Sequence, residues 1–108
     1  MKAVLINAKD QTVTDVEYDG NWKSISKLID CNLFAVAPGC PDGDDLYVDE
    51  EGLLTVNEDS VWFQVPWFPE PLVGSGLILG LNRETGESED CNHNADFYRD
   101  QVRFLKTI

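Results

Sequence analysis

The stretch "KAVLINAKDQTVTDVEYDG", residues 2 to 20, decides the fold that we expect. It holds two runs of strand length, "KAVLI" and "TVTDVEY", on either side of the polar turn "NAKDQ". The first run is continuously apolar from Ala3 to Ile6, as in a fully buried strand, and the second alternates, as in a strand with one exposed face. The chain is therefore predicted to open with an antiparallel β-hairpin.

The remaining segments extend this hairpin to an α+β domain. Apolar residues recur at helical spacing in 21 to 31, with Trp22, Ile25 and Ile29 on the buried face, and again in 95 to 106. The runs "LFAVA" and "LYV" lie on either side of the turn "PGCPDGDD" and predict a second hairpin, and "VWFQV" and "LVGSGLILGL" are also of strand length. We expect a single small domain over residues 1 to 108, in which at least four strands form a mostly antiparallel sheet covered by two helices.

The charge of the chain limits its partners. It carries 20 acidic against 8 basic residues, a formal net charge of -12. Direct binding of a nucleic-acid backbone is therefore not expected, and a charge-steered partner should be basic. No apolar run reaches the roughly 18 residues that span a bilayer, and the hydrophobic stretch in "MKAVLINAKDQ" is too short for a secretory signal. We expect a cytoplasmic protein that does not bind membranes.

The three cysteines predict neither a disulfide framework nor a metal site. Cys31, Cys40 and Cys91 are odd in number and lack CxxC spacing, which favours reduced thiols. With His93 they offer the ligand types of a Cys₃His zinc site, but structural zinc ligands usually come in closely spaced pairs. We expect no metal and no cofactor.

An acidic run lies between residues 42 and 51. A calcium loop of the EF-hand type does not fit, because Leu46 and Tyr47 occupy positions that need a ligand and a glycine. We predict an acidic partner face, with a solvated turn as the alternative. Its members are Asp42, Asp44, Asp45, Asp49, Glu50 and Glu51.

The most aromatic stretch is "SVWFQVPWFPEPL", residues 60 to 72. Side chains alternate along a strand, so Phe63 is predicted in the core and Trp62 on the opposite face. Rigid aromatic residues beside polar ones resemble interface anchors, although a cluster capping the sheet edge remains the alternative. The predicted binding residues are Trp62, Trp67 and Phe68. Arg83, Arg99 and Arg103 are the nearby candidates to hold an anion against these rings, and Arg83 is the predicted helper.

Catalytic motifs are weak. His93 is the sole histidine and stands in a polar loop, where an exposed and idle side chain is the usual finding. No serine lies in a nucleophile elbow, and "GSGLILG" lacks the spacing of a phosphate loop. We expect the protein not to be an enzyme.

The order of these segments resembles the domain-of-unknown-function 3846 family, small proteins met mostly in bacteriophages, plasmids and their bacterial hosts. The pieces that carry the resemblance are the opening hairpin, "NWKSISKLIDC", "DLYVDEEGLL", the step from Asn57 to Ser60, "PLVGSGLILG" and the closing segment. The resemblance implies a phage-type accessory protein and transfers no catalytic residues.

The leading hypothesis is a non-enzymatic counter-defence protein that antagonises a host antiviral system. It would bind a host protein with a basic surface or sequester a small nucleotide signal in an aromatic-lined pocket. The alternatives are an enzyme acting on a small metabolite and an acidic DNA-mimic antirestriction protein, the latter only if the acidic residues gather on one face. Formation of a homo-oligomer stays open.

Overall fold

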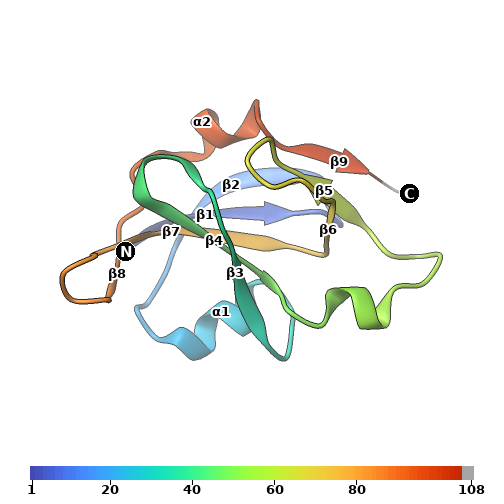
Figure 1. Ribbon diagram of the computed structural model, residues 1–108, viewed down its shortest axis with the longest axis horizontal. Coiled ribbons are helices and arrows are strands. Elements are labelled where there is room, and N and C mark those ends of the chain that lie inside the picture. The colour runs from blue at the N-terminus through green and yellow to red at the C-terminus, as the bar shows by residue number, and fades with distance from the viewer. Residues whose placement is uncertain (106–108) are drawn as a thin grey trace.

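The computed structural model describes residues 1–105, with the side chain of Thr55 outside the description. In chain order its elements are β1 (Lys2–Asn7), β2 (Thr12–Glu17), α1 (Trp22–Leu28), β3 (Phe34–Ala37), η1 (Pro41–Gly43), β4 (Asp44–Asp49), η2 (Gly52–Thr55), β5 (Trp62–Gln64), β6 (Leu72–Val73), β7 (Gly76–Leu81), β8 (Ser88–Glu89), α2 (Ala95–Arg99) and β9 (Arg103–Leu105). Figure 1 shows strands across the middle of the molecule, with α1 below them and α2 above them. Within the described part of the chain, no helix has the length and apolar character needed to cross a membrane.

The strands form two antiparallel sheets. In the main sheet they lie in the order β2-β1-β7-β4-β3, and β8 pairs with the end of β7. The smaller sheet has the order β6-β5-β9. The predicted opening hairpin is confirmed, since β1 pairs with β2 from Lys2 opposite Glu17 to Asn7 opposite Thr12. The prediction of at least four strands in one mostly antiparallel sheet is confirmed as well.

Strand β7 lies at the centre of the main sheet because its residues are apolar on both faces. Leu77 and Leu79 pack on one face, in a cluster with Ile25 and Ile29 from the α1 segment. Ile78 packs on the opposite face, since side chains alternate along a strand. The main sheet therefore separates two hydrophobic cores.

The second core lies under the smaller sheet and α2. Phe63 of β5 and Tyr98 of α2 are fully buried in it together with Ile78. Gly76 of β7 allows this close packing, because a Cβ atom there would lie 3.0 Å from Phe63 Cζ. The two predicted helices are present on mostly antiparallel sheets, although both helices are small.

The closing segment differs from the helix that the sequence predicted over 95 to 106. Helix α2 ends at Arg99, and residues 103 to 105 form strand β9 with Phe104 opposite Phe63 of β5. Pairing with this distant strand overrides the helical spacing of the apolar residues. Residue 106 lies outside the described part of the chain.

Two further predictions are corrected. The run "LVGSGLILGL" is not one strand, because the backbone turns at Gly74, which has a φ of 83°, and β6 and β7 belong to different sheets. Helix α1 is shorter than 21 to 31, and Trp22 in its first turn is 63% exposed instead of buried. The centroid of its ring lies 6.5 Å from that of Phe34, at the edge of the cluster that contains Ile25 and Ile29.

Candidate functional site

Strand β4 divides the acidic run, so the run does not form the single partner face that the sequence predicted. Because β4 has six residues, its two ends are separated by roughly 16 Å at about 3.3 Å per residue. We call the region of Asp42, Asp44 and Asp45 the β4 start. We call the region of Asp49, Glu50 and Glu51 the β4 end.

At the β4 start, Asp44 is an internal residue and is not available to a partner. Its side chain is 1% exposed and accepts three hydrogen bonds, from Asn92 N at 2.8 Å, Asn92 Nδ2 at 2.9 Å and Tyr98 Oη at 2.5 Å. Burial, together with the bond to Asp44, raises the pKa of Tyr98, so this hydroxyl remains a donor. Asp44 therefore fastens the segment around Asn92 and helix α2 to the sheet.

The other carboxylates of the β4 start also have internal partners. Asp42 Oδ2 lies 2.6 Å from His93 Nε2, and the His93 ring stacks on Phe97 at 3.7 Å between centroids. His93 is thus half-buried and paired, which corrects the prediction of an exposed, idle histidine. Asp45 is mostly buried and lies 3.8 Å from Arg83 Nη2.

Two thiols flank this network without being activated. Cys91 Sγ donates a hydrogen bond to the His93 carbonyl at 2.8 Å, and Cys40 Sγ lies 3.7 Å from Tyr98 Oη. Burial raises the pKa of Cys40 to about 12 and the pKa of Cys91 to about 11. Because the thiolate is the nucleophilic form, neither thiol is prepared for attack near neutral pH.

The ligand types that a Cys₃His zinc site would need are not brought together. Cys31 belongs to the cluster on the α1 side of the main sheet, whereas Cys40 and Cys91 pack on the opposite side. Among residues 1–105, no group of three or more His, Cys, Asp or Glu side chains is placed to hold a metal ion.

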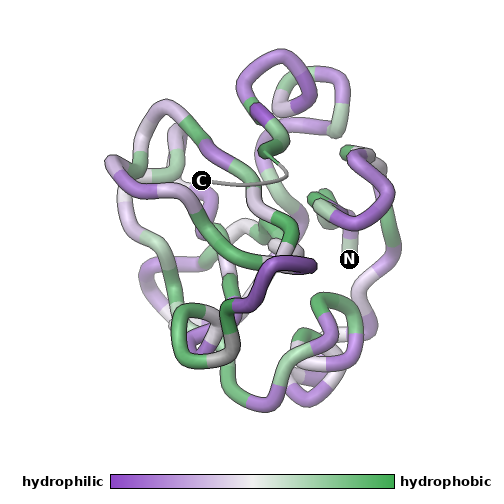
Figure 2. The backbone as a smooth tube through the Cα atoms, turned by 90° about the vertical axis from the view of Figure 1, so that its right-hand side faces the viewer, coloured by the Kyte–Doolittle hydropathy of each residue, from purple (hydrophilic) through white to green (hydrophobic). Residues whose placement is uncertain are grey.

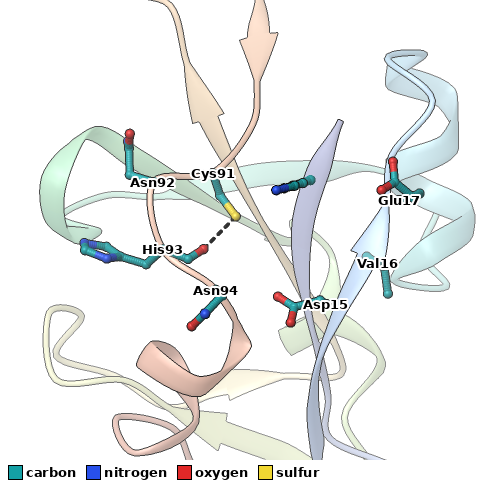
Figure 3. Close-up of a pocket in the computed structure, with 8 residues that line it drawn as sticks. Asp15, Val16, Glu17, Cys91, Asn92, His93 and Asn94 are labelled. Atoms are coloured by element: carbon teal, nitrogen blue, oxygen red, sulfur yellow. Dashed lines mark hydrogen bonds between the residues drawn. The ribbon is translucent and has the colours of Figure 1, made fainter.

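A polar hollow of about 570 Å³ lies between the β1–β2 hairpin and residues 91 to 94. Lys2, Asp15 and Glu17 form the hairpin side of its wall. Figure 3 shows the His93 ring directed away from the Cys91 sulfur, consistent with its engagement by Asp42. Since Lys2 is accompanied by two carboxylates, the hollow has no excess of positive charge.

The β4 end has a different character, because it leads into η2, which exposes two consecutive leucines. Leu53 is 68% exposed and Leu54 is 82% exposed. Leu33, 54% exposed, lies close to the same turn, since its carbonyl accepts a hydrogen bond from Glu50 N at 3.0 Å. These three side chains leave apolar area in contact with water.

Carboxylates accompany the exposed leucines. A hollow of about 390 Å³ beside Leu54 includes Asp30, Asp49 and Glu51 in its wall. Figure 2 views the molecule from the side on which η2 lies in Figure 1 and shows hydrophobic turns next to hydrophilic segments. We call this region the η2 surface. Its members are Asp30, Leu33, Asp49, Glu50, Glu51, Leu53 and Leu54.

The aromatic stretch is divided between core and surface. Phe63 is fully buried, as predicted, while Trp62 and Gln64 on the other face of β5 are half-buried. Trp67 is half-buried and packs against the core, with its ring 5.9 Å from the Tyr98 ring. Its indole Nε1 is buried and has no hydrogen-bond partner among the described residues. Phe68 also packs partly against the core.

The arginine beside the aromatic stretch is Arg103, not the predicted Arg83. Arg83 makes its contacts at the β4 start, where its Nη2 donates to the Gly43 carbonyl at 3.4 Å. Arg103 lies directly opposite Gln64 in the β5–β9 ladder and shares a hollow with Phe68. The sequence named Arg103 as one of three candidates but favoured Arg83, because the pairing of residues 103 to 105 with β5 is a long-range contact that local spacing does not reveal.

Comparison with known proteins places the chain in one family. The family model described as "Domain of unknown function (DUF3846)" matches residues 1–103. No curated protein and no solved structure matches the chain.

Proposed function

We propose that this chain, which belongs to the DUF3846 family, is a non-enzymatic accessory protein that binds a host protein with a basic surface. Its setting would be counter-defence, in which a phage-type protein antagonises a host antiviral system in the host cytoplasm. The observation that carries the binding function is the η2 surface, where Leu53 and Leu54 are 68% and 82% exposed beside carboxylates.

The anatomy of this surface supports a protein partner. Single exposed apolar residues are normal, but adjoining ones rimmed by polar groups are typical of an interaction site. A partner that covers Leu33, Leu53 and Leu54 removes their apolar area from water, which is favourable. The carboxylates of the rim steer a basic surface toward the leucines, and the net charge of -12 strengthens this attraction.

Other features of the chain favour binding over the two alternative functions. The thiols of Cys40 and Cys91 have pKa values raised by burial, so neither is prepared as a nucleophile beside this network. Duplex mimicry needs exposed carboxylates gathered on one face, whereas Asp44 is buried and Asp42 and Asp45 contact His93 and Arg83.

The test reverses charge at the η2 surface and at a matched control position. The test variant carries Glu50→Lys and Glu51→Lys, and the control carries Glu84→Lys and Glu87→Lys in the exposed loop before β8, at the other end of the molecule in Figure 1. Both pairs change the net charge equally. Each immobilised protein is exposed to a host extract, and the retained basic proteins are quantified by mass spectrometry.

We expect the test variant to retain at least about tenfold less of a specific basic protein, since like charges across an interface cost several kcal/mol. The control should retain the same amount as the native chain. In cells, the test variant should also lose the ability to raise the plating efficiency of a defence-sensitive phage. Equal losses for both variants would show that retention follows net charge alone, and the η2 surface would not be the site.

A further inference from the structure

A small hollow on the smaller sheet differs in charge from the rest of the molecule. It has a volume of about 370 Å³ and lies where β5, the proline-rich segment and the approach to β9 meet. A volume above roughly 300 Å³ is sufficient for a small-molecule site. We call it the Arg103 hollow. The residues of its wall used below are Gln64, Pro66, Phe68, Pro69, Gln101 and Arg103.

Carboxylates are missing from the described wall of this hollow. Three other hollows lie beside residues 91 to 94, beside Leu54 and beside Leu53. Each of them includes at least two Asp or Glu residues in its wall. In a chain with 20 acidic and 8 basic residues, a wall with an arginine and no carboxylate is unusual. An anion would therefore meet less repulsion here than at those hollows.

Arg103 is also available to a ligand. Its side chain is exposed, and it makes no ion pair or hydrogen bond with another residue of the described range 1–105. Arg83 and Arg99, in contrast, are paired with Asp45 and Asp96. A guanidinium presents donors in a planar fork that matches the oxygens of a phosphate or carboxylate.

The remaining wall fits a flat ring next to the anion. Phe68 is half-buried and packs partly against the core, so its ring has little freedom left to lose on binding. Gln64 lies opposite Arg103 on the outer face of the ladder, where facing Cβ atoms are about 5 Å apart. Gln101 donates from Nε2 to the Phe97 carbonyl at 3.1 Å, which leaves its amide oxygen to accept a bond from a ligand.

We propose that the Arg103 hollow binds a small planar anion of the nucleoside monophosphate class. The phosphate lies on the Arg103 guanidinium, the base stacks on Phe68, and the Gln64 and Gln101 amides contact the polar edge of the base. This site is separate from the η2 surface and does not depend on the protein partner proposed there.

The probe is adenosine 5′-monophosphate, titrated by isothermal calorimetry and by amide chemical shifts at low ionic strength. We expect saturable binding to the native chain, with shifts centred on residues 64 to 69 and 101 to 105. Arg103→Gln should weaken binding by about tenfold or more, because hydrogen bonds to charged groups contribute more than neutral ones. Adenosine and inorganic phosphate, each carrying one half of the ligand, should each bind at least about tenfold more weakly.

The matched control is Lys9→Gln, which removes one positive charge from the exposed turn between β1 and β2. It should bind the probe as the native chain does. Phe68→Leu is the second test of the site and should weaken the monophosphate more than inorganic phosphate. Its melting temperature is measured in parallel, and Arg103→Gln gives an independent test on an exposed residue if the Phe68 variant unfolds.

Three outcomes would overturn the proposal. The first is no binding of the monophosphate by the native chain at millimolar concentration. The second is equal affinity for the native chain and Arg103→Gln. The third is an equal loss in Lys9→Gln and Arg103→Gln, which would assign the attraction to overall charge. Inorganic phosphate binding as tightly as the monophosphate would overturn the stacking role of Phe68.

Discussion

The two ends of β4 carry three acidic residues each and use them in opposite ways. At the β4 start each carboxylate has an internal partner. Asp42 contacts His93, and Asp45 lies near Arg83. Asp44 accepts hydrogen bonds from Tyr98 and Asn92. At the β4 end, the carboxylates stand beside leucines that are exposed to water. The contacts at the β4 start join β4 to distant segments of the chain, whereas at the β4 end Asp49 accepts a local hydrogen bond from Glu51 N and Glu50 is exposed. The first set stabilises the fold, and the second remains accessible to another molecule. The count of acidic residues alone does not distinguish these two uses.

The largest effect is expected for Asp44→Ala at the β4 start. The change removes a fully buried acceptor, so Asn92 N loses its partner and Tyr98 Oη keeps only the weak contact with Cys40 Sγ. Since each orphaned buried group costs about 1–3 kcal/mol, the free energy of unfolding should fall by about 3 kcal/mol. Urea denaturation followed by tryptophan fluorescence measures this loss.

The control for Asp44→Ala is Glu50→Ala at the β4 end. Glu50 is exposed, so its replacement should change the free energy of unfolding by no more than about 0.5 kcal/mol. If both variants lost the same stability, the contrast between the two ends would fail.

The next effect is expected for Gly80→Ala, opposite Asp44 in the β4–β7 ladder. A Cβ atom at Gly80 would lie 2.3 Å from the Asp90 carbonyl oxygen, so the backbone near Asp90 would have to move away. We expect a loss of about 1–3 kcal/mol, the usual cost of overpacking. Amide shifts should change around residues 90 to 94 and not at residues 49 to 54. Unchanged amide shifts around Asp90 would show that the close approach of Gly80 to the Asp90 carbonyl does not help to hold the β4 start together.

Local periodicity predicted the parts of the fold whose partners are close in sequence. The opening hairpin and the β3–β4 pair follow from strand-length runs around polar turns. Strand β9 could not be predicted in the same way, because its partner β5 lies some forty residues earlier and its apolar residues also fit a helix. For the same reason the sequence favoured Arg83 over Arg103 as the arginine beside the aromatic stretch.

The candidate sites depended even more on tertiary structure. Asp44 and Asp45 are adjacent in sequence, and the sequence treats them alike. Their fates differ because alternation along β4 turns Asp44 toward Tyr98 and Asp45 toward the opposite face. The sequence did place Phe63 inside and Trp62 outside, since that distinction rests on the same alternation within a single strand.

Thiol reactivity should report the same contrast. Cys40 and Cys91 lie near the β4 start with pKa values raised to about 12 and about 11 by burial, and Cys31 lines the hollow beside Leu54. Alkylation by iodoacetamide at pH 8 should therefore modify Cys31 first and Cys40 last, as located by peptide mass spectrometry. Modification of Cys40 before Cys31 would contradict the burial at the β4 start.

The sign of the pH dependence follows from these raised pKa values. Unfolded thiols ionise near pH 9, whereas the folded chain keeps Cys40 and Cys91 protonated up to about pH 12 and pH 11. Stability from this source is complete below pH 9 and is lost as the pH rises from 9 toward 12. Cys40→Ser should make the decline of the unfolding free energy over this range shallower, and an unchanged decline would contradict the assignment.

A smaller effect is expected for Asp42→Asn. Asp42 has a left-handed backbone with a φ of 59°, which asparagine also tolerates, so the change tests the contact with His93 and not the turn. Because the Asp42 side chain is 64% exposed, losing this contact should cost no more than about 1 kcal/mol. Thermal melting with and without added salt measures the difference. A loss as large as that of Asp44→Ala would mean that the surface pair, and not the buried carboxylate, holds the β4 start closed.

The smallest effect on stability is expected for Leu54→Ser at the β4 end. This side chain is 82% exposed, so folding buries little of its apolar area and the free energy of unfolding should change by no more than about 0.5 kcal/mol. A core leucine of β7 such as Leu79 offers the contrast, because truncation to alanine there should cost about 2–5 kcal/mol.

Leu54→Ser should instead lower the retention of the basic host protein, since the leucine is buried only when that partner is bound. Parallel urea denaturation and retention measurements separate the two effects. If Leu54→Ser lost substantial stability, the leucine would be covered within the folded chain in solution. Unchanged stability together with unchanged retention would leave the exposed leucines without a role in binding, and the β4 end would be an ordinary solvated turn.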